Sequence, residues 1–369
     1  MKVYLDNAAT TPVAEEVIGE VSSVMRSHFG NPSSIHQQGR DARALVEMSR
    51  KKIATFIGAQ SSEIVFTSGG TEADNLAIHA AIHDLKVEHI ISSALEHSAV
   101  YNTLKKCEVA VHWVKTNSFG EVDINHLRQL LEQLNGKVLV SLMHVNNEIG
   151  TILPMQEVGL LCKEFGAFFH SDTVQSIGHL PLNVKELNID FITCSAHKIH
   201  GLKGTGFLYV NKRNKIGAQI IGGGQERDIR SGTENVLGIV SMAKALSLCK
   251  IEEETKHAQA LKNKLCNGLK AIYNDDLKVN GSLENSTPYV LNVCLPARSN
   301  ASMLLFNLDL EGIAVSGGSA CSSGSHKSSR VLLELGIDES MPAVRFSFSR
   351  YNTTEEIDLV LEKIKAIYP

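Results

Sequence analysis

A lysine that follows an expected strand is the residue best placed for covalent chemistry in this sequence. Ser195-Ala196-His197-Lys198 comes after the apolar run of residues 191–194 and before the glycines at 201, 204 and 206. A lysine amine is a useful nucleophile only when its surroundings lower its pKa or supply a carbonyl partner. Taken alone, Lys198 is more simply explained as a solvated surface lysine, so the rest of the site must decide.

A carboxylate at the end of another expected strand supplies the next part of a site. Residues 168–172 form an apolar strand pattern that ends in Asp172, at the place where open α/β sheets bind their ligands. Asp172 would hold the protonated ring nitrogen of pyridoxal phosphate (PLP), the usual carbonyl partner of a catalytic lysine. Gln175 follows one turn later. The alternative for Asp172 is a helix N-cap.

A glycine-rich turn between a strand and a helix predicts a phosphate-binding site. Ser68-Gly69-Gly70-Thr71-Glu72 joins the expected strand Ile64–Thr67 to a helical pattern over residues 73–81. Helix N-termini present free N–H groups to anions, Gly70 lets the backbone approach closely, and Thr71 adds a hydroxyl donor. The alternative is a plain capped turn. The spacing of a nucleotide-binding P-loop is absent.

Polar residues also follow two more of the expected strands. His97 would stack on a pyridine ring and move protons, although a loop histidine is more often merely exposed. Asn147 lies in a polar cluster over residues 146–150, which also fits a turn rich in Asn and Gly. Because four successive strand ends carry such groups at one rim of the sheet, we favour a single site there.

Cys321 differs in its surroundings from the other six cysteines. It lies in residues 317–330, where nine of fourteen residues are Gly or Ser, and this composition predicts a mobile loop. An exposed thiol is a nucleophile when deprotonated, and His326 and Lys327 would lower its pKa modestly. The alternative is an incidental loop cysteine. The other six cysteines occupy mostly apolar contexts, and we assign them to packing.

An arginine in a strand and three histidines raise two further possibilities. Arg345 interrupts the apolar pattern of residues 343–348, and its planar guanidinium suits a substrate carboxylate or, alternatively, a structural ion pair. His197 and His200, with His170, suggest a metal site only weakly, because no carboxylate stands at ligand spacing. We therefore expect no metal.

The composition excludes some classes of partner. The chain has 369 residues, 43% of them hydrophobic, and a formal net charge of −4. It carries no basic tract with interleaved aromatics, so nucleic acid is not expected as a partner. No apolar run reaches the length of a membrane span, and a strand pattern begins at once at the N-terminus, which leads us to expect a cytoplasmic protein.

The apolar pattern predicts an α/β protein with two domains. Strand-like runs alternate with helical stretches, which favours a seven-stranded, mostly parallel sheet covered on both faces. The expected strands are residues 64–67, 89–93, 110–114, 138–143, 168–172, 191–195 and 206–210. After a charged helix near residues 250–272, strand candidates at 290–295, 313–316 and 343–348 and a helix over 354–367 indicate a smaller α+β domain.

The motifs together resemble the cysteine desulfurases, PLP enzymes of aminotransferase class V. The resemblance runs nearly end to end, with the motifs in the family's order. They are Tyr4-Leu5-Asp6-Asn7-Ala8-Ala9-Thr10-Thr11-Pro12, Gly30-Asn31-Pro32-Ser33-Ser34, Phe66-Thr67-Ser68-Gly69-Gly70-Thr71-Glu72, His144-Val145-Asn146-Asn147-Glu148-Ile149-Gly150, Ser195-Ala196-His197-Lys198, Arg230-Ser231-Gly232-Thr233 and Ser319-Ala320-Cys321.

The resemblance implies the PLP-dependent transferase architecture of fold type I and a homodimer. The large PLP-binding domain would span residues 12–255, and the small domain residues 1–11 and 256–369. Lys198 would bind PLP covalently, Asp172 would pair with its ring nitrogen, and His97 would stack on the ring. Asn147 and Gln175 would flank its phenolic oxygen. The remaining implied roles are phosphate binding by Gly70, Thr71, Ser195 and His197, phosphate binding in the neighbouring subunit by Thr233, and binding of the substrate carboxylate by Asn31 and Arg345.

In the implied reaction, Lys198 moves a proton from Cα of L-cysteine while Cys321 attacks the substrate sulfur, giving alanine and a persulfide. The loop around Cys321 resembles the first of the two desulfurase groups, whose acceptors include iron–sulfur scaffolds and tRNA-thiolation proteins. Two departures are Leu202, where a proline is usual, and the end at Pro369, where many members continue with a scaffold-docking tail, so the acceptor stays open. Selenocysteine cleavage, transamination and a PLP-free sulfur-carrying adaptor remain alternatives.

Overall fold

Seven strands form one sheet in which most neighbours run parallel. The computed structural model describes residues 2–317 and 329–369. The strand order is β2-β8-β7-β6-β5-β3-β4, and β8 is antiparallel to both of its neighbours. The strands are β2 (Ile64–Thr67), β3 (His89–Ser93), β4 (Ala110–Val114), β5 (Val138–Ser141), β6 (Phe168–Asp172), β7 (Phe191–Ser195) and β8 (Gly206–Val210). The expected α/β class with a mostly parallel seven-stranded sheet is confirmed.

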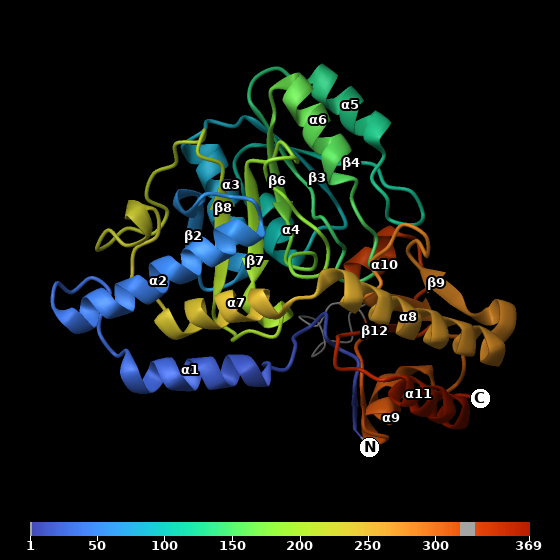
Figure 1. Cartoon of the computed structure of the whole chain (residues 1–369). Helices are drawn as coiled ribbons and strands as arrows, with labels where there is room; N and C mark the ends of the chain where they lie inside the picture. The colour runs from blue at the N-terminus through green and yellow to red at the C-terminus, as the bar shows by residue number, and fades with distance from the viewer. Residues whose placement is uncertain (1, 318–328) are drawn as a thin grey trace.

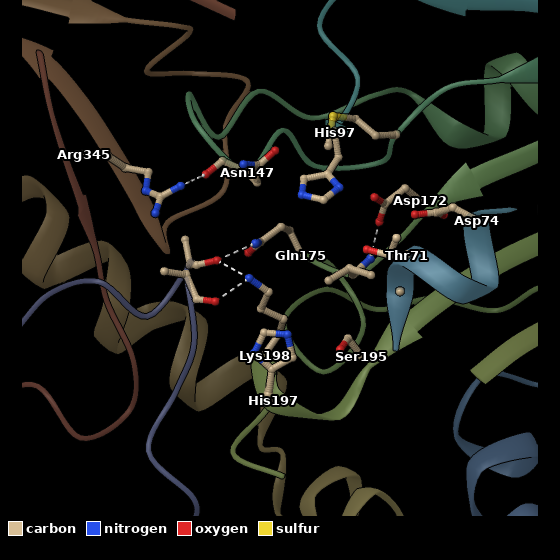
Figure 2. Close-up of a pocket in the computed structure, with 15 residues that line it drawn as sticks. Thr71, Asp74, His97, Asn147, Asp172, Gln175, Ser195, His197, Lys198 and Arg345 are labelled. Atoms are coloured by element: carbon tan, nitrogen blue, oxygen red, sulfur yellow. Dashed lines mark hydrogen bonds between the residues drawn. The ribbon is translucent and has the colours of Figure 1, made fainter. Parts of the chain in front are cut away.

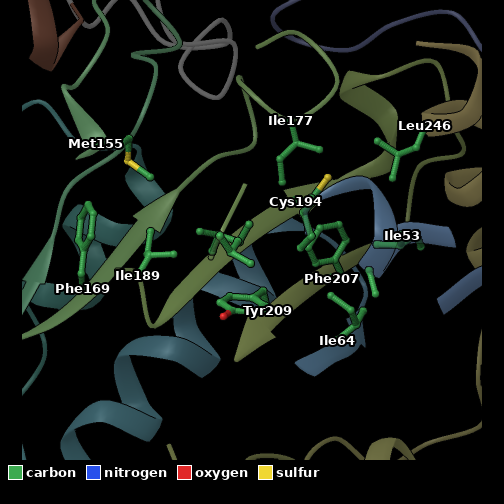
Figure 3. Packing of buried hydrophobic residues seen from close by; sticks show 14 of the residues in the cluster. Ile53, Ile64, Met155, Phe169, Ile177, Ile189, Cys194, Phe207, Tyr209 and Leu246 are labelled. Atoms are coloured by element: carbon green, nitrogen blue, oxygen red, sulfur yellow. The ribbon is translucent and has the colours of Figure 1, made fainter. Parts of the chain in front are cut away.

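Helices cover both faces of this sheet (Figure 1). Phe207 and Tyr209 of β8 pack into one large core, part of which Figure 3 shows, whereas Leu208 between them packs with α3 on the opposite face. This alternation follows from the two-residue period of a strand. The helices are α1 (Glu15–Ser27), α2 (Gln37–Phe56), α3 (Gly70–His83), α4 (Ser98–Leu104), α5 (Ile124–Gln133), α6 (Met155–Phe165) and α7 (Val236–Leu248).

A second hydrophobic core lies outside the seven-stranded sheet and joins the two ends of the chain. Figure 1 places both termini at this end of the molecule. The elements that build it are β1 (Val3–Tyr4), α8 (Ile251–Tyr273), β9 (Lys278–Asn280), β10 (Val290–Cys294), α9 (Leu304–Leu310), β11 (Ile313–Ala314), β12 (Ala343–Ser347) and α11 (Thr354–Ile367). The division of the chain near residue 255 stays a prediction.

The first residues of the chain connect this second core to the sheet. Leu5 is fully buried in the second core, and its N–H donates to the carbonyl oxygen of Ala314 at 2.9 Å. A few residues later, the N–H of Thr11 donates to the carbonyl oxygen of His197 at 2.9 Å. The chain between these two contacts therefore passes along the segment that follows β7.

Several expected boundaries are wrong by one or two residues. The strands expected over 138–143, 290–295, 313–316 and 343–348 end at Ser141, Cys294, Ala314 and Ser347. The loop expected over 317–330 also ends early. The hydroxyl of Ser329 accepts the N–H of Leu332 at 3.3 Å and caps α10 (Arg330–Glu334), so Arg330 is helical. Cys321 lies outside the described residues.

The described part of the chain contains no helix that is both long and apolar enough to span a bilayer.

The six described cysteines fit the packing role predicted for them. Cys162, Cys194, Cys266 and Cys294 are buried, and Cys107 and Cys249 are half-buried. Burial raises the pKa of the Cys249 thiol to about 12, and it raises the thiol pKa values of Cys162 and Cys194 as well. These thiols are therefore poor nucleophiles.

Candidate active site

One pocket collects most of the residues that the sequence singles out (Figure 2). It lies at the carboxyl ends of the parallel strands, and β12 and the N-terminal segment complete its wall. The predicted site residues that line it are Gly70, Thr71, His97, Asn147, Asp172, Gln175, Ser195, His197, Lys198 and Arg345. The other lining residues are Ala8, Ala9, Asp74, Met143 and Val174.

Lys198 presents its amine to the pocket from a short helical turn directly after β7. This turn, η2, spans Ala196–Lys198. The Nζ atom donates hydrogen bonds to the carbonyl oxygens of Ala8, at 2.5 Å, and Ala9, at 2.8 Å. Gln175 Nε2 donates to the same Ala8 oxygen at 2.9 Å. Carbonyl groups of the N-terminal segment thus fix where the amine lies (Figure 2).

Asp172 carries its carboxylate at the end of β6, on the same strand-end rim as Lys198. Its Oδ1 accepts the N–H of Val174 at 2.9 Å, so the local turn resembles the capping alternative raised from the sequence. The side chain is nevertheless directed into the pocket (Figure 2). Burial and the nearby Asp74 raise the pKa of Asp172, so a cation beside it would favour its charged form.

His97 stands at the N-cap of α4 and points its ring into the same pocket (Figure 2). Its Nδ1 accepts the N–H of Ala99 at 3.2 Å. An imidazole nitrogen that accepts a hydrogen bond carries no proton, so this contact assigns the proton of a neutral ring to Nε2. The ring lines the same pocket as Lys198 and Asp172.

The opposite wall presents hydrogen-bond donors of the kind that suit an anion. Helix α3 begins at Gly70, and its first turn presents backbone N–H groups that have no partner within the helix, beside the Thr71 hydroxyl. Ser195 and His197 line the same wall. Burial lowers the pKa of His197 to about 4, and its Nδ1 lies 3.1 Å from the Thr10 hydroxyl. A neutral His197 offers hydrogen bonds without adding charge.

Arg345 reaches the pocket from β12, where it forms the ion pair that the sequence raised as one alternative, and its role toward a substrate carboxylate stays a prediction. The residue is 1% exposed, and its Nη2 pairs with Asp6 Oδ1 at 2.9 Å. Its Nη1 donates to the backbone oxygen of Asn147, also at 2.9 Å. The guanidinium is thus an ion-pair partner and a pocket-lining group, and it tethers Asn147 (Figure 2).

Two of the predicted site residues that the structure describes, Asn31 and Thr233, do not line this pocket. Asn31 is exposed, and its Oδ1 accepts the N–H of Ser33 at 2.9 Å. Thr233 lines a separate cavity with Ser68 and Arg230. Cys321 lies outside the described residues.

The sequence reasoning missed Asp74, which lies on α3 and is 1% exposed. Burial raises the pKa of its carboxyl to about 7. One carboxylate oxygen of Asp74, one of Asp172 and a ring nitrogen of His97 all lie within 4.8 Å of one another. The available signal was position. Asp74 comes three residues after Thr71, so it lies on the same face of α3 as the turn predicted to bind phosphate.

The comparison with known proteins agrees with this geometry. The family model for class-V aminotransferases matches residues 3–360. The protein named cysteine desulfurase IscS from Dictyoglomus turgidum is 42% identical over 375 residues, which cover 99% of this chain and 94% of that protein. A NifS-like protein of known structure has a TM-score of 0.91 at 36% identity, with 100% of this chain and 99% of that chain covered. SspA, solved in complex with cysteine, has a TM-score of 0.82 at 30% identity, with 96% of this chain and 100% of that chain covered. The chain therefore belongs to the class-V aminotransferase family and, within it, to the cysteine desulfurases of the NifS/IscS type.

Proposed function

We propose that this protein is a PLP-dependent cysteine desulfurase, which converts L-cysteine to L-alanine and leaves the sulfur as a persulfide on Cys321. The observation that carries the proposal is the connection between the pocket and the segment that contains Cys321. One described end of that segment is hydrogen-bonded to Arg345, which lines the pocket, and the other end to Glu148 and Glu96, the sequence neighbours of the pocket residues Asn147 and His97. The family and the desulfurase names of its relatives set the reaction class.

The pocket residues fit PLP by the chemistry of their donors. A lysine amine, a buried carboxylate, a histidine ring and an anion-binding helix terminus suit the four parts of that cofactor: its carbonyl, ring nitrogen, ring face and phosphate. The protonated ring nitrogen would give Asp172 a cationic partner. When bound, PLP supplies a carbonyl for amines and an electron-withdrawing ring.

The contacts around the segment of residues 318–328 support its access to the pocket. On one side, the N–H of Arg345 donates to the oxygen of Ser316 at 2.7 Å. On the other side, Ser329 Oγ donates to Glu148 Oε2, and Arg330 Nη2 donates to the backbone oxygen of Glu96. Cys321 is four residues beyond Gly317, so chain length alone allows it to lie up to about 14 Å from that residue.

The sulfur step balances without an external oxidant. The Cys321 thiolate attacks the substrate sulfur, forming an S–S bond as the Cβ–S bond of the substrate breaks. The electron pair released at Cβ is protonated, and the carbon skeleton leaves as alanine. Lys198 takes the proton from Cα, His97 is positioned to move a further proton, and Arg345 would bind the carboxylate.

The partners follow from the same proposal. L-cysteine is the substrate, a second copy of the chain completes the cofactor site through Thr233, and a further protein accepts the sulfur. An iron–sulfur scaffold or a tRNA-thiolation protein fits that last role. We also propose a cytoplasmic location, where thiols stay reduced.

The test is to incubate the purified protein with L-cysteine and a reductant, and to quantify sulfide and alanine together. We expect a yellow protein that yields equal amounts of both products. Lys198→Ala should lose the colour and both products, and Cys321→Ser should keep the colour but lose desulfuration. Cys107→Ser is the matched control, because this half-buried thiol is outside the pocket, and it should retain full activity.

Each other outcome points to a different function. A colourless wild type would favour a PLP-free sulfur carrier. Alanine or pyruvate formation that is insensitive to Cys321→Ser would identify a different PLP reaction. Assaying selenocysteine beside cysteine separates the last alternative, because cleavage of selenocysteine does not depend on the loop thiol.

A further inference from the structure

Two buried groups next to the pocket have no role in the proposed reaction. Asp74 on α3 is 1% exposed, and His170 on β6 is fully buried. Nε2 of His170 lies 3.4 Å from Oδ1 of Asp74. Among the described residues, neither atom has a hydrogen bond of good geometry. A buried carboxylate that lies beside a second carboxylate and has so few hydrogen bonds needs an explanation.

The two carboxylates are too close for both to be ionised at low cost. The Asp74 and Asp172 oxygens lie within 4.8 Å of each other and are shielded from water. Like charges at such a separation favour the retention of one proton by the pair. Asp172 accepts the N–H of Val174, and this hydrogen bond favours its charged form. Asp74 is therefore the better holder of the proton.

His170 provides an acceptor for that proton. Burial lowers the pKa of His170 to about 4, so the ring is neutral and carries a single N–H. Its Nδ1 lies 2.8 Å from the Ser141 hydroxyl. If Nδ1–H donates to Ser141, Nε2 carries no proton and can accept a hydrogen bond from the protonated carboxyl oxygen of Asp74. Asp74, His170 and Ser141 then form a neutral, fully buried hydrogen-bond chain.

We propose that Asp74 is a positioning residue, which stays a neutral carboxylic acid hydrogen-bonded to His170 so that Asp172 alone carries the negative charge facing the bound cofactor. This inference rests on the proposed PLP site and assigns it a proton-holding group. Asp74 acts through Asp172 and touches no reacting atom.

The other charged and titratable groups around Asp74 are few. From β6, Asp172 and His170 face it. From the segment before α4, His97 and Glu96 interact electrostatically with Asp74. Burial also raises the pKa of Glu96. From β7, the hydroxyl of Thr193 faces it. His97 favours the ionised form of Asp74, whereas burial dominates and favours the neutral form.

The test measures PLP binding to the apoprotein between about pH 6 and 9, in buffers of different ionisation heat. Asp74→Asn keeps the shape, is neutral at every pH, and can donate to His170. Its PLP affinity should match that of the wild type within about threefold at pH 6.5. Because burial raises the pKa of Asp74 to about 7, we expect wild-type Asp74 to ionise above that pH when PLP is absent and to regain a proton on binding. The Kd ratio of wild type to Asp74→Asn should therefore rise toward about tenfold per pH unit.

Proton uptake gives a second readout that a packing role would not change. At about pH 8.5 the wild type should take up close to one more proton per PLP than Asp74→Asn. Asp74→Ala should bind more weakly than Asp74→Asn at every pH. Asp84→Asn makes the same change just beyond the other end of α3, where Asp84 binds Gly217 and Gln219, and should behave as wild type.

The outcomes separate this inference from the proposed function. If the wild type and Asp74→Asn bind PLP with the same pH dependence and proton uptake, Asp74 is not the proton holder. A large loss of affinity in Asp74→Asn at low pH would mean that Asp74 acts as an anion, and this too would overturn the inference. Failure of the wild type to bind PLP would instead contradict the proposed cofactor.

Discussion

At the scale of single residues, Arg345 shows how one side chain holds a structural contact and faces the pocket at once. Its two terminal nitrogens bind Asp6 and the backbone of Asn147. We expect Arg345→Lys to raise the KM for L-cysteine at least about tenfold and to lower kcat less. A lysine cannot reproduce a planar two-point contact, and one charged hydrogen bond contributes about 1.5–3 kcal/mol. Steady-state kinetics with thermal unfolding would measure this.

The control for Arg345 lies five residues further along the chain. Arg350 donates to the backbone oxygen of Leu248 and to Glu254, outside the pocket. Arg350→Lys should therefore alter stability without altering KM. If Arg345→Lys behaves in the same way, Arg345 serves only as the ion-pair partner of Asp6, and the substrate carboxylate binds elsewhere.

At the scale of elements, one glycine lets β8 pass close to the turn that starts α3. A Cβ atom at Gly206 would lie 2.4 Å from the carbonyl oxygen of Cys194 and 2.7 Å from Cα of Gly69. Gly206→Ala must displace one of these backbones. We expect a loss of about 1–3 kcal/mol in the free energy of unfolding. PLP affinity should fall as well, because the anion-binding helix terminus moves.

A glycine in open space is the control for Gly206. Gly19 on α1 has no atom within 4 Å of an added Cβ. Gly19→Ala should be neutral, or stabilising by up to about 1 kcal/mol through helix propensity. PLP titration and thermal unfolding of both variants would test this pair. Unchanged PLP affinity in Gly206→Ala would mean that α3 does not depend on this close approach.

The elements also explain which parts of the site could be predicted from the sequence. Lys198 and Asp172 each follow an apolar run, and the carboxyl ends of parallel strands meet at one rim, so their proximity follows from the pattern. Asp74 lies within a helix, where a carboxylate usually faces solvent, and only the packing of α3 against β6 and β7 buries it. The sequence also did not predict that Arg330 is helical. The high Gly and Ser content of residues 317–330 predicts a loop, whereas the Ser329 cap and the contact of Arg330 with Glu96 depend on the folded structure.

At the scale of the whole molecule, the N-terminal segment links the two cores through the pocket. Leu5 is buried in the second core, while the carbonyl oxygens of Ala8 and Ala9 bind Lys198. Arg345 approaches the same pocket from the second core, through β12. A shift of one core against the other would therefore change the position of both the amine and the guanidinium. The pocket depends on long-range contacts that no local motif encodes.

The surface near α1 leads to the last prediction, on oligomeric state. Ile18 and Met25 are exposed two turns apart on this helix, and Phe29 and Ile35 after it are 81% and 90% exposed. Apolar side chains this exposed indicate an interface, and a symmetric dimer would bury the same patch on both copies.

Light scattering should therefore give a mass near twice 40.2 kDa. Phe29→Lys with Ile35→Lys should give a monomer that binds PLP more weakly, because the proposed contact of Thr233 of a second copy with the cofactor would be lost. Phe306→Lys changes a side chain on α9 that is 54% exposed, and this variant should remain dimeric. A wild type that is monomeric at micromolar concentration, or a double variant that stays dimeric, would place the subunit contact elsewhere or remove it altogether.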